Sequence, residues 1–398
     1  MKVLHIIPSI AAVRGGPSKA VIEMVKSLQN ANCEVTIATT NDNGETLLDV
    51  PLTELQEYQG VPVRFFTRFS PKISAIREFA FSASFTRWLW QNIDYYDLLH
   101  VHAIFSYTST ATMAIARLKN VPYIVRPLGQ LCQWSLQQSQ RKKQFYLRII
   151  EQANLNQAKA IHFTTKAEYD EAQELGLKAP EVIIPHGLTI APKVASASLQ
   201  LRQWLHLPDD EPIVLFLSRI HPKKGLEILI QALARLVDQR FTFVIAGSGD
   251  PNHENEIHAC LQQSGIGDRT RMLGFIEGEK KDLLLQGADL FALTSYSENF
   301  GVAVLEALAA GLPCVVTPGV ALSVVVKQQD LGIVPEMDEA AIATAICTCL
   351  NQPDMTKKIG DRARQFIFEN YTWDNIATNL VEIYNAIIQN QPLPHFHA

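Results

Sequence analysis

The chain has 398 residues and a formal net charge of −5; 47% of its residues are hydrophobic and 19% are charged. This composition is typical of a globular protein and argues against long disordered segments. One hydrophobic core does not support a chain of this length, so two domains are expected. The charge balance lacks the basic excess of a nucleic-acid binder, and no nucleic-acid partner is expected.

Targeting signals are weak. The apolar N-terminal segment is broken by Pro8 and leads into a glycine turn, which favours a first buried strand over a signal peptide. No uninterrupted apolar run approaches the ~18 residues of a membrane span. The six cysteines show neither a disulfide framework nor a zinc motif, as expected of a cytoplasmic protein. The basic run Arg141–Lys143 fits a solvated helix face or, alternatively, an anionic acceptor or a lipid headgroup, so peripheral contact with the inner face of the membrane stays open.

Short β-branched runs alternate with helical patterns over the first half of the chain. A helix is predicted over Ser18–Asn30, with Ser18 as its N-cap after a glycine turn. Most of the strands are apolar enough to be buried on both faces, as parallel strands are. The predicted strands are Val3–Ile7, Val35–Thr39, Val63–Phe65, Leu98–Val101, Tyr123–Arg126, Ala160–Thr164 and Val182–Ile184.

A polar, irregular stretch over about residues 189–212 is followed by a second array of the same kind. Its predicted strands are Ile213–Leu217, Phe241–Ala246, Arg271–Leu273, Leu290–Leu293, Pro313–Val316 and Gly332–Val334. Two such arrays indicate an α/β protein of two doubly wound, Rossmann-like domains that face each other across a cleft. The predicted domains are residues 1–189 and 190–372, and residues 373–398 are expected to pack back toward the first domain as a helix.

The most informative segment reads SYSENFGVAVLEALAAGLP from residue 295. A helix is predicted to begin at Gly301 and to end at Gly311. The start of such a helix offers backbone amides and a positive dipole end to a diphosphate. Glu298 before the helix and Glu306 within it can each accept hydrogen bonds from hydroxyl groups. The alternative is an ordinary strand–loop–helix unit with two surface glutamates.

A basic segment, FLSRIHPKKG, follows the first strand of the second half from residue 216. A departing nucleotide diphosphate gains negative charge and needs preplaced cations. Arg219 offers a planar fork to phosphate oxygens, and Lys224 offers a point charge. A solvated basic loop is the alternative.

Two further features lie in the first half. Gly15 and Gly16 follow the first strand and allow a ligand close to the backbone, although a tight turn is an equal reading and the spacing is no dinucleotide fingerprint. His100 and His102 share one strand face. Structural burial is the alternative to a ligand contact, and a metal site is not favoured because no third ligand lies nearby in the sequence.

Together these motifs resemble the retaining glycosyltransferases of family 4, which have the GT-B fold, and in particular members that build exopolysaccharides. The run ENFGVAVLEALAAGLP is similar to the Glu-x7-Glu signature of that family almost letter for letter. The resemblance spans essentially the whole chain. It implies retention of the anomeric configuration without a metal or other cofactor.

The resemblance also implies residue roles. Glu298 would contact the hydroxyls of the donor sugar, Glu306 the ribose, and Arg219 with Lys224 the diphosphate. The catalytic set is then His102, Arg219, Lys224 and Glu298, with His102 at the donor sugar. The further donor-binding residues are Gly15, Gly16, Gly247, Phe275, Asn299, Phe300, Gly301 and Val302.

The expected activity is transfer of a hexose, glucose from UDP-glucose, to a saccharide or lipid-linked saccharide in polysaccharide biosynthesis. The segment Arg126–Gly129 resembles an acceptor-side loop of the exopolysaccharide-building members, many of which carry histidine where this chain has Leu128. Two alternatives stay open. One is a sugar-nucleotide 2-epimerase, and the other is a non-catalytic sugar-nucleotide-binding protein.

Overall fold

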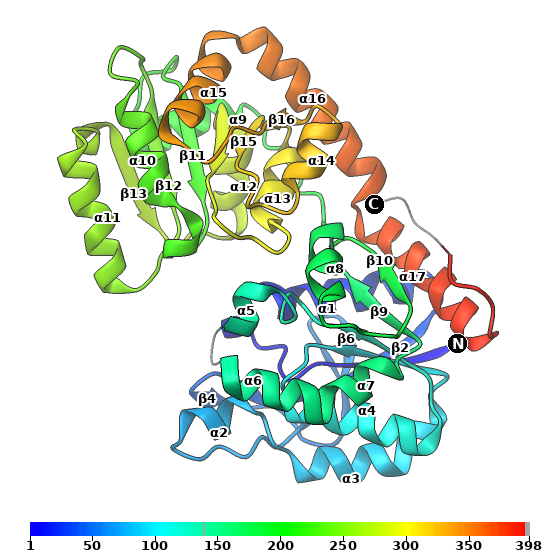
Figure 1. Cartoon of the computed structure of the whole chain (residues 1–398). Helices are drawn as coiled ribbons and strands as arrows, with labels where there is room; N and C mark the ends of the chain where they lie inside the picture. The colour runs from blue at the N-terminus through cyan, green and yellow to red at the C-terminus, as the bar shows by residue number, and fades with distance from the viewer. Residues whose placement is uncertain (138–139, 395–398) are drawn as a thin grey trace. The chain divides into compact units, whose positions relative to one another are not determined.

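The computed structural model describes residues 1–137 and 140–394 and divides into two compact units (Figure 1). Unit 1 comprises Met1–Gly187 and Trp373–Ala398, and unit 2 comprises Leu188–Thr372. The chain therefore leaves unit 1 once and returns to it for the last helix. In the predicted basic run, the side chains of Arg141 and Lys142 lie outside the described part.

Unit 1 contains an eight-stranded sheet in the order β10-β9-β8-β7-β1-β2-β6-β5. All neighbouring strands are parallel except β5 and β6, which form an antiparallel pair. The winding direction reverses beside β1 and β7, and ligands bind at such switch points in doubly wound sheets. The strands are β1 (Lys2–Ile6), β2 (Glu34–Thr40), β5 (Leu55–Tyr58), β6 (Val61–Phe66), β7 (Leu98–His102), β8 (Tyr123–Arg126), β9 (Ala160–Phe163) and β10 (Glu181–Ile183).

Helices cover both faces of this sheet. One face packs against α1 (Gly16–Asn30) and α17 (Trp373–Ile388), which also contact each other. The other face packs against α3 (Ala83–Asn92) and α4 (Tyr107–Lys119). The first layer is therefore built from segments more than 340 residues apart in the sequence. Shorter elements complete the unit: β3 (Asp42–Asn43), β4 (Thr46–Leu47), α2 (Ser74–Glu78), α5 (Gln133–Gln137), α6 (Gln140–Tyr146), a π-helical turn (Leu147–Glu151), α7 (Gln152–Asn156) and α8 (Lys166–Gln173).

The start of α1 differs from the prediction. The helix begins at Gly16 with Gly15 as its N-cap, and Ser18 lies inside its first turn. Its hydroxyl donates a hydrogen bond to the Ser9 carbonyl at 3.1 Å. The predicted cap at Ser18 is therefore wrong, because Pro17 favours the first helical positions and lets the helix begin earlier.

Unit 2 contains a six-stranded, entirely parallel sheet in the order β13-β12-β11-β14-β15-β16. The predicted α/β class of two Rossmann-like sheets is thus confirmed. The strands are β11 (Ile213–Leu217), β12 (Thr242–Ala246), β13 (Thr270–Gly274), β14 (Leu290–Leu293), β15 (Cys314–Val316) and β16 (Gly332–Ile333). The helices are α9 (Ala197–Leu205), α10 (Leu226–Ala234), α11 (Pro251–Gln263), α12 (Gly278–Gly287), α13 (Val302–Ala310), α14 (Ser323–Gln328), α15 (Glu339–Asn351) and α16 (Pro353–Asn370).

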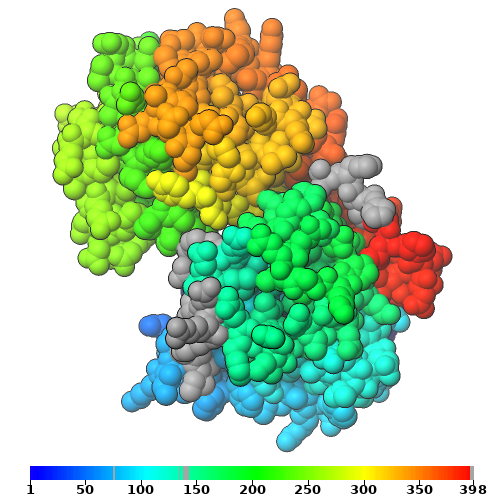
Figure 2. Space-filling model, in the orientation of Figure 1, coloured from blue at the N-terminus to red at the C-terminus, as the bar shows by residue number. Residues whose placement is uncertain are grey.

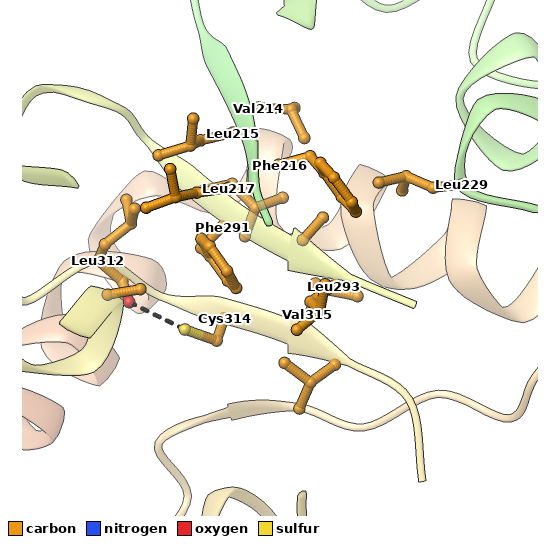
Figure 3. Close-up of a cluster of buried hydrophobic side chains, with 14 of the residues drawn as sticks. Val214, Leu215, Phe216, Leu217, Leu229, Phe291, Leu293, Leu312, Cys314 and Val315 are labelled. Atoms are coloured by element: carbon orange, nitrogen blue, oxygen red, sulfur yellow. Dashed lines mark hydrogen bonds between the residues drawn. The ribbon is translucent and has the colours of Figure 1, made fainter. Parts of the chain in front are cut away.

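Apolar side chains of β11, β14 and β15 form the centre of unit 2 (Figure 3). Phe216 and Phe291 are completely buried there, and burial of each ring contributes about 2–3 kcal/mol. The Cys314 thiol donates to the Leu312 carbonyl at 3.4 Å. In Figure 2, α11 in yellow-green and α15 with α16 in orange lie on the visible surface of unit 2. Helices thus cover the visible face of unit 2.

Among the described residues, no helix combines the length and the apolar character that a membrane crossing requires.

Candidate active site

Three loops in unit 2 follow the carboxyl ends of the neighbouring strands β12, β11 and β14, and they are bonded to one another. The Ile220 amide donates to the Ser248 carbonyl at 3.0 Å, and the Tyr296 amide donates to the Lys223 carbonyl at 2.8 Å. These backbone hydrogen bonds hold the three loops in fixed positions relative to one another, so that they form one continuous surface. The predicted donor-binding residues of unit 2 lie on or beside this surface.

Two glycines allow the loops to approach so closely. Gly225 has a φ of +59°, and a Cβ there would lie 2.2 Å from the Thr294 carbonyl oxygen. Gly247 has a φ of +149°, and a Cβ there would lie 1.8 Å from the Ser218 carbonyl oxygen. A side chain is excluded at both positions by backbone atoms, so the close packing of the loops requires glycine there.

The helix α13 begins after Gly301 and ends at Gly311, both in the left-handed region, so its predicted glycine boundaries are confirmed. The loop before it is held by backbone pairing with the segment after β15. The Glu298 amide donates to the Gly319 carbonyl at 2.8 Å, and the Ala321 amide donates to the Glu298 carbonyl at 3.0 Å. This pairing positions Glu298 just before the N-terminus of α13.

Each predicted carboxylate of the Glu-x7-Glu motif is paired with a lysine. Lys224 forms an ion pair with Glu298, and their side chains are 8% and 17% exposed. Lys281 on α12 donates from Nζ to Oε1 of Glu306 at 2.7 Å. The sequence analysis missed Lys281, because no motif marks it and only the packing of α12 against α13 brings it to Glu306.

The electrostatics of these lysines favour an anion. Burial, and then the positive charges of Lys223 and Arg219, lower the pKa of Lys224 to about 7. A diphosphate placed beside Lys224 would favour the charged form of its amine. Arg219 is exposed on the same loop, and its guanidinium forms no ion pair within the described part of the chain.

The other predicted donor residues of unit 2 differ in accessibility. Phe275 follows β13 and is 69% exposed. Phe300 is buried in the core of unit 2, so only its backbone is available to a ligand. Asn299 and Val302 are partly buried on either side of Gly301.

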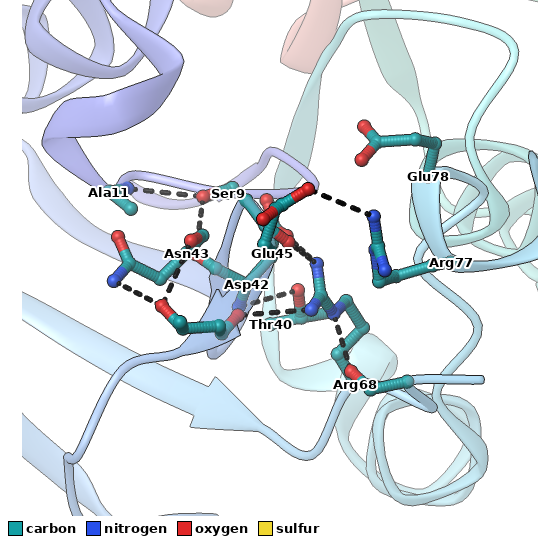
Figure 4. A network of polar contacts seen from close by, with 12 residues as sticks. Ser9, Ala11, Thr40, Asp42, Asn43, Glu45, Arg68, Arg77 and Glu78 are labelled. Carbon is teal, nitrogen blue, oxygen red and sulfur yellow. Dashed lines mark hydrogen bonds and ion pairs between the residues drawn. The ribbon is translucent and has the colours of Figure 1, made fainter. Parts of the chain in front are cut away.

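In unit 1, the predicted glycine loop is anchored by a network of charges (Figure 4). Arg14 donates to Asp42 at 2.6 Å and to Glu78 at 2.7 Å, and the bond to Asp42 raises the pKa of its guanidinium. Ser9 donates to the Asp42 carbonyl at 2.8 Å, and the buried Arg68 forms an ion pair with the Asp42 carboxylate. The loop after β1 is thus tied to the loop after β2.

Anchoring by Arg14 leaves the next two residues open. Gly15 has a φ of +73°, and a Cβ at Gly15 or Gly16 would meet no atom within 4 Å. The backbone at this loop is therefore accessible, unlike that at the buried Gly225.

The predicted His102 belongs to a cluster of buried histidines at the ends of β1 and β7. His5 Nδ1 lies 3.0 Å from His102 Nε2, and His100 Nδ1 lies 2.7 Å from the Tyr384 hydroxyl of α17. Burial, the largest cause, lowers the pKa of His5 to about 3 and those of His100 and His102 well below the usual value. The structure supplies the third histidine that is not near in sequence: ring nitrogens of His5, His100 and His102 lie within 4.8 Å of one another.

Comparison with known proteins identifies both units. The family model described as "Glycosyl transferases group 1" matches residues 199–366, within unit 2. The model described as "Glycosyl transferase 4-like domain" matches residues 15–187, within unit 1. The chain belongs to the family 4 type of glycosyltransferases. The matched regions of the chain contain both lysine–glutamate pairs and the glycine loop.

Relatives of known sequence agree with this assignment. An uncharacterized glycosyltransferase of Methanocaldococcus jannaschii is 32% identical over 193 residues, which are 48% of this chain and 49% of that protein. The D-inositol 3-phosphate glycosyltransferase of Salinispora tropica is 27% identical over 403 residues, 94% of this chain and 81% of that protein. The matches to the first relatives span about half of those proteins' length.

Solved structures share the fold. Sucrose-phosphate synthase from Thermosynechococcus elongatus superposes with a TM-score of 0.77 at 21% identity, covering 98% of this chain and all of that one. Anabaena HepE in complex with UDP-glucose superposes with a TM-score of 0.74 at 21% identity, covering 97% of this chain and all of that one. The chain therefore has the GT-B fold that the resemblance implied.

Proposed function

We propose that the chain is a retaining hexosyltransferase that moves a hexose from a nucleotide-diphosphate sugar to a saccharide or lipid-linked saccharide acceptor. The observation that carries this proposal is that Glu298, just before α13, and Glu306, in the middle of α13, are each paired with a separate lysine. Carboxylates accept hydrogen bonds from sugar hydroxyls, and lysines with a helix N-terminus favour a diphosphate. A nucleotide sugar needs acceptors for its hydroxyls and positive charge for its diphosphate, and residues of both kinds lie after the carboxyl ends of the strands of unit 2.

Within this proposal, Glu306 accepts hydrogen bonds from the ribose and Glu298 from the donor sugar. Arg219 and Lys224 stabilise the diphosphate, whose charge rises as it leaves. The backbone around Gly301 contacts the sugar and phosphates. The other contacts proposed for the donor are Gly15, Gly16, Gly247, Phe275, Asn299, Phe300 and Val302.

The proposed chemistry uses no side-chain nucleophile. The bond between the anomeric carbon and the phosphate oxygen breaks, and an acceptor hydroxyl forms the new bond on the same face of the ring. The hydroxyl proton passes to the departing phosphate. His102 contacts the donor sugar through its backbone. Arg219 and Lys224 supply the positive charge that a metal would otherwise bring, so we expect activity to survive chelation.

We propose UDP-glucose as the donor and polysaccharide biosynthesis at the cytoplasmic face of the membrane as the setting. The support for the donor is the solved Anabaena HepE, whose structures are described as complexes with UDP and with UDP-glucose. The support for the setting is the resemblance of the sequence to exopolysaccharide-building members.

Isothermal titration with UDP, GDP and ADP tests the site. We expect one diphosphate to bind, and Glu306→Ala to weaken it at least tenfold because the ribose loses its acceptor. Glu279→Ala, at an exposed position of α12, is the matched control and should leave the affinity unchanged. Failure of all three diphosphates to bind the wild-type protein would contradict the proposed function. A UDP-sugar isomerised without an acceptor would instead favour an epimerase.

A further inference from the structure

Adjacent strands of unit 1 place polar side chains on one otherwise apolar face of the sheet, at its carboxyl edge. They are His162 on β9, Arg126 on β8, His102 on β7 and His5 on β1, and each is at most 1% exposed. Arg126 and His102 are register partners on neighbouring strands, so their side chains project to the same side. This edge is where doubly wound sheets bind ligands.

The Arg126 guanidinium has no partner in the described part of the chain. Its Nε and Nη1 atoms are buried without a hydrogen-bond acceptor. Glu168 is the acidic neighbour that acts on its charge, but both oxygens of that carboxylate are used elsewhere. They accept bonds from the Gly129 amide at 2.6 Å and from the Thr164 amide and hydroxyl at 2.8 Å. A buried charge without a counterion is strongly unfavourable.

Two histidines beside Arg126 are also incompletely bonded. His5 Nε2 and His102 Nδ1 are buried and have no hydrogen-bond partner. Of the ten buried side-chain atoms without a partner among the described residues, four thus belong to Arg126, His5 and His102. Such atoms are rare in proteins, so their concentration in one place points to a missing ligand.

The hydrogen bonds of His100 and the positive charge of Arg126 argue against a metal cation as the missing ligand. Both ring nitrogens of His100 are engaged, because its Nδ1 accepts from the Tyr384 hydroxyl and its Nε2 bonds to His162 Nδ1 at 3.3 Å. His162 Nε2 donates to the Ile184 carbonyl, so Nδ1 of the neutral His162 is an acceptor. His100 Nε2 must therefore donate to it, which leaves His100 Nδ1 as the acceptor for Tyr384. Burial keeps these histidines neutral, and the nearby guanidinium would repel a cation.

We propose that Arg126, together with His102 and His5, forms an anion subsite that binds the carboxylate or phosphate of an acidic saccharide acceptor. A guanidinium presents a planar fork to two oxygens of such a group, and a ring N–H adds a further donor. The diphosphate of the donor already has Arg219 and Lys224 in unit 2. The assignment to the acceptor rests on the proposed function.

The pKa of Arg126 and the backbone around it agree with such a subsite. Burial lowers the pKa of Arg126 to about 10, as expected for a cation that lacks its counterion. Ala103, directly after β7, and Leu128, two residues after β8, have φ values of +69° and +58°. Non-glycine residues in this strained region cluster at ligand sites.

The test compares Arg126→Met with a matched control, Arg117→Met. The guanidinium of Arg117 is bonded to the side chains of Asn154 and Gln157, away from the histidines. Glucuronate and glucose 6-phosphate, which distinguish a carboxylate from a phosphate, are titrated into each protein in the presence of saturating UDP. UDP alone and UDP-glucuronate are titrated separately, and the melting temperature of each ligand-free protein is measured.

We expect one of the two acidic sugars to bind the wild type and the control, and to bind Arg126→Met at least tenfold more weakly. UDP affinity should be unchanged, and the ligand-free variant should melt no lower than the wild type, because it loses an unpaired buried charge. The proposal is overturned if neither acidic sugar binds the wild type, or if Arg126→Met binds it as tightly as the wild type does. It is also overturned if ligand-free Arg126→Met melts several degrees below the wild type. If Arg126→Met lost affinity for UDP-glucuronate alone, the anion bound by Arg126 would belong to the donor, and the assignment to the acceptor would be refuted. Absence of UDP binding by the wild type would instead contradict the proposed function.

Discussion

Glu306 does not stand alone on α13, since Lys281 occupies one of its two carboxylate oxygens. The lysine thereby limits how the carboxylate can turn and leaves Oε2 to accept other bonds. A diol such as a ribose requires an acceptor in a fixed orientation. The contact suggests that Lys281 orients Glu306 rather than binding the nucleotide itself.

A double-mutant cycle tests this role at the scale of the residue. Lys281→Met should weaken nucleotide binding severalfold in the wild-type background, because Glu306 loses its orientation. The same substitution should have little effect once Glu306→Ala is present, since the pair is then already broken. Titration calorimetry on the four proteins gives the coupling. Additive losses would show that Lys281 contacts the nucleotide independently.

Sequence motifs predicted the carboxylates and cations of unit 2 but not their partners. Glu298, Glu306, Arg219 and Lys224 lie in continuous motifs beside strand ends, which a sequence displays directly. Lys281 meets Glu306 only through helix packing. The roles of all these residues remain predictions.

The cluster in unit 1 depended still more on the third dimension. His100 and His102 are two residues apart, but His5 joins them through the register of β1 with β7. Likewise, Arg126 lacks a hydrogen-bond acceptor only because none of the side chains that surround it in the fold supplies one. The sequence marked Arg126 only through the resemblance of Arg126–Gly129 to an acceptor-side loop, and it carried no signal for His5 or for the unpaired guanidinium.

At the scale of elements, the loops of unit 2 depend on glycines that admit neighbouring backbone. Gly247→Ala would force a methyl group to within 1.8 Å of the Ser218 carbonyl oxygen in a left-handed conformation. We expect it to destabilise unit 2 by more than about 2 kcal/mol, because both strain and displacement of the backbone are required.

Gly265→Ala separates the cost of the backbone conformation from the cost of displacing the neighbouring backbone. Gly265 also has a positive φ, +73°, but a Cβ there would meet no atom within 4 Å. Its substitution should therefore cost only the ~1–2 kcal/mol of the backbone conformation. Urea unfolding of both variants measures the difference, and equal losses would show that close packing at Gly247 contributes nothing.

Buried parallel strands were predicted well because each is a short apolar run between helices. The antiparallel edge strand β5 and the short pair β3–β4 were missed. Their sequences are largely polar, and Asp42 is the one fully buried residue among them, so they lack the pattern of a buried strand. The start of α1 was misplaced because glycine and proline together allow an earlier first turn.

At the scale of the whole molecule, the buried histidines make stability depend on pH. Burial lowers the pKa values of His5 and His162 to about 3, whereas an unfolded histidine has a pKa of about 6.5. The unfolded state therefore binds more protons between these values. The stability from neutral burial is complete above pH 6.5 and is lost as the pH falls toward 3.

We accordingly expect the free energy of unfolding to fall from pH 7.5 to 5.5, with each such histidine contributing up to about 1.4 kcal/mol per pH unit below 6.5. Urea titrations at several pH values measure this slope. His162→Asn should lower stability at pH 7.5 but reduce the slope. A free energy that is constant over this range would contradict the argument.

The two units also differ in how the chain completes them. Unit 2 is one continuous segment, Leu188–Thr372, whereas the core of unit 1 needs α17. A fragment of residues 188–372 should unfold cooperatively and bind the nucleotide. A chain ending at residue 372 should expose the apolar face that Leu380 and Ile383 cover, and should bind a hydrophobic dye. Equal dye binding by the full and shortened chains would contradict this expectation.

The return of the chain to unit 1 has a consequence for biosynthesis. A ribosome makes the whole of unit 2 before it makes α17, so the sheet of unit 1 stays without this helix until residues 373–388 have been made. During that interval the sheet of unit 1 presents an apolar face and a row of buried histidines to water. We expect newly made chains to rely on chaperones at this stage, and premature termination in the last 26 residues to leave a folded second unit attached to an aggregating first.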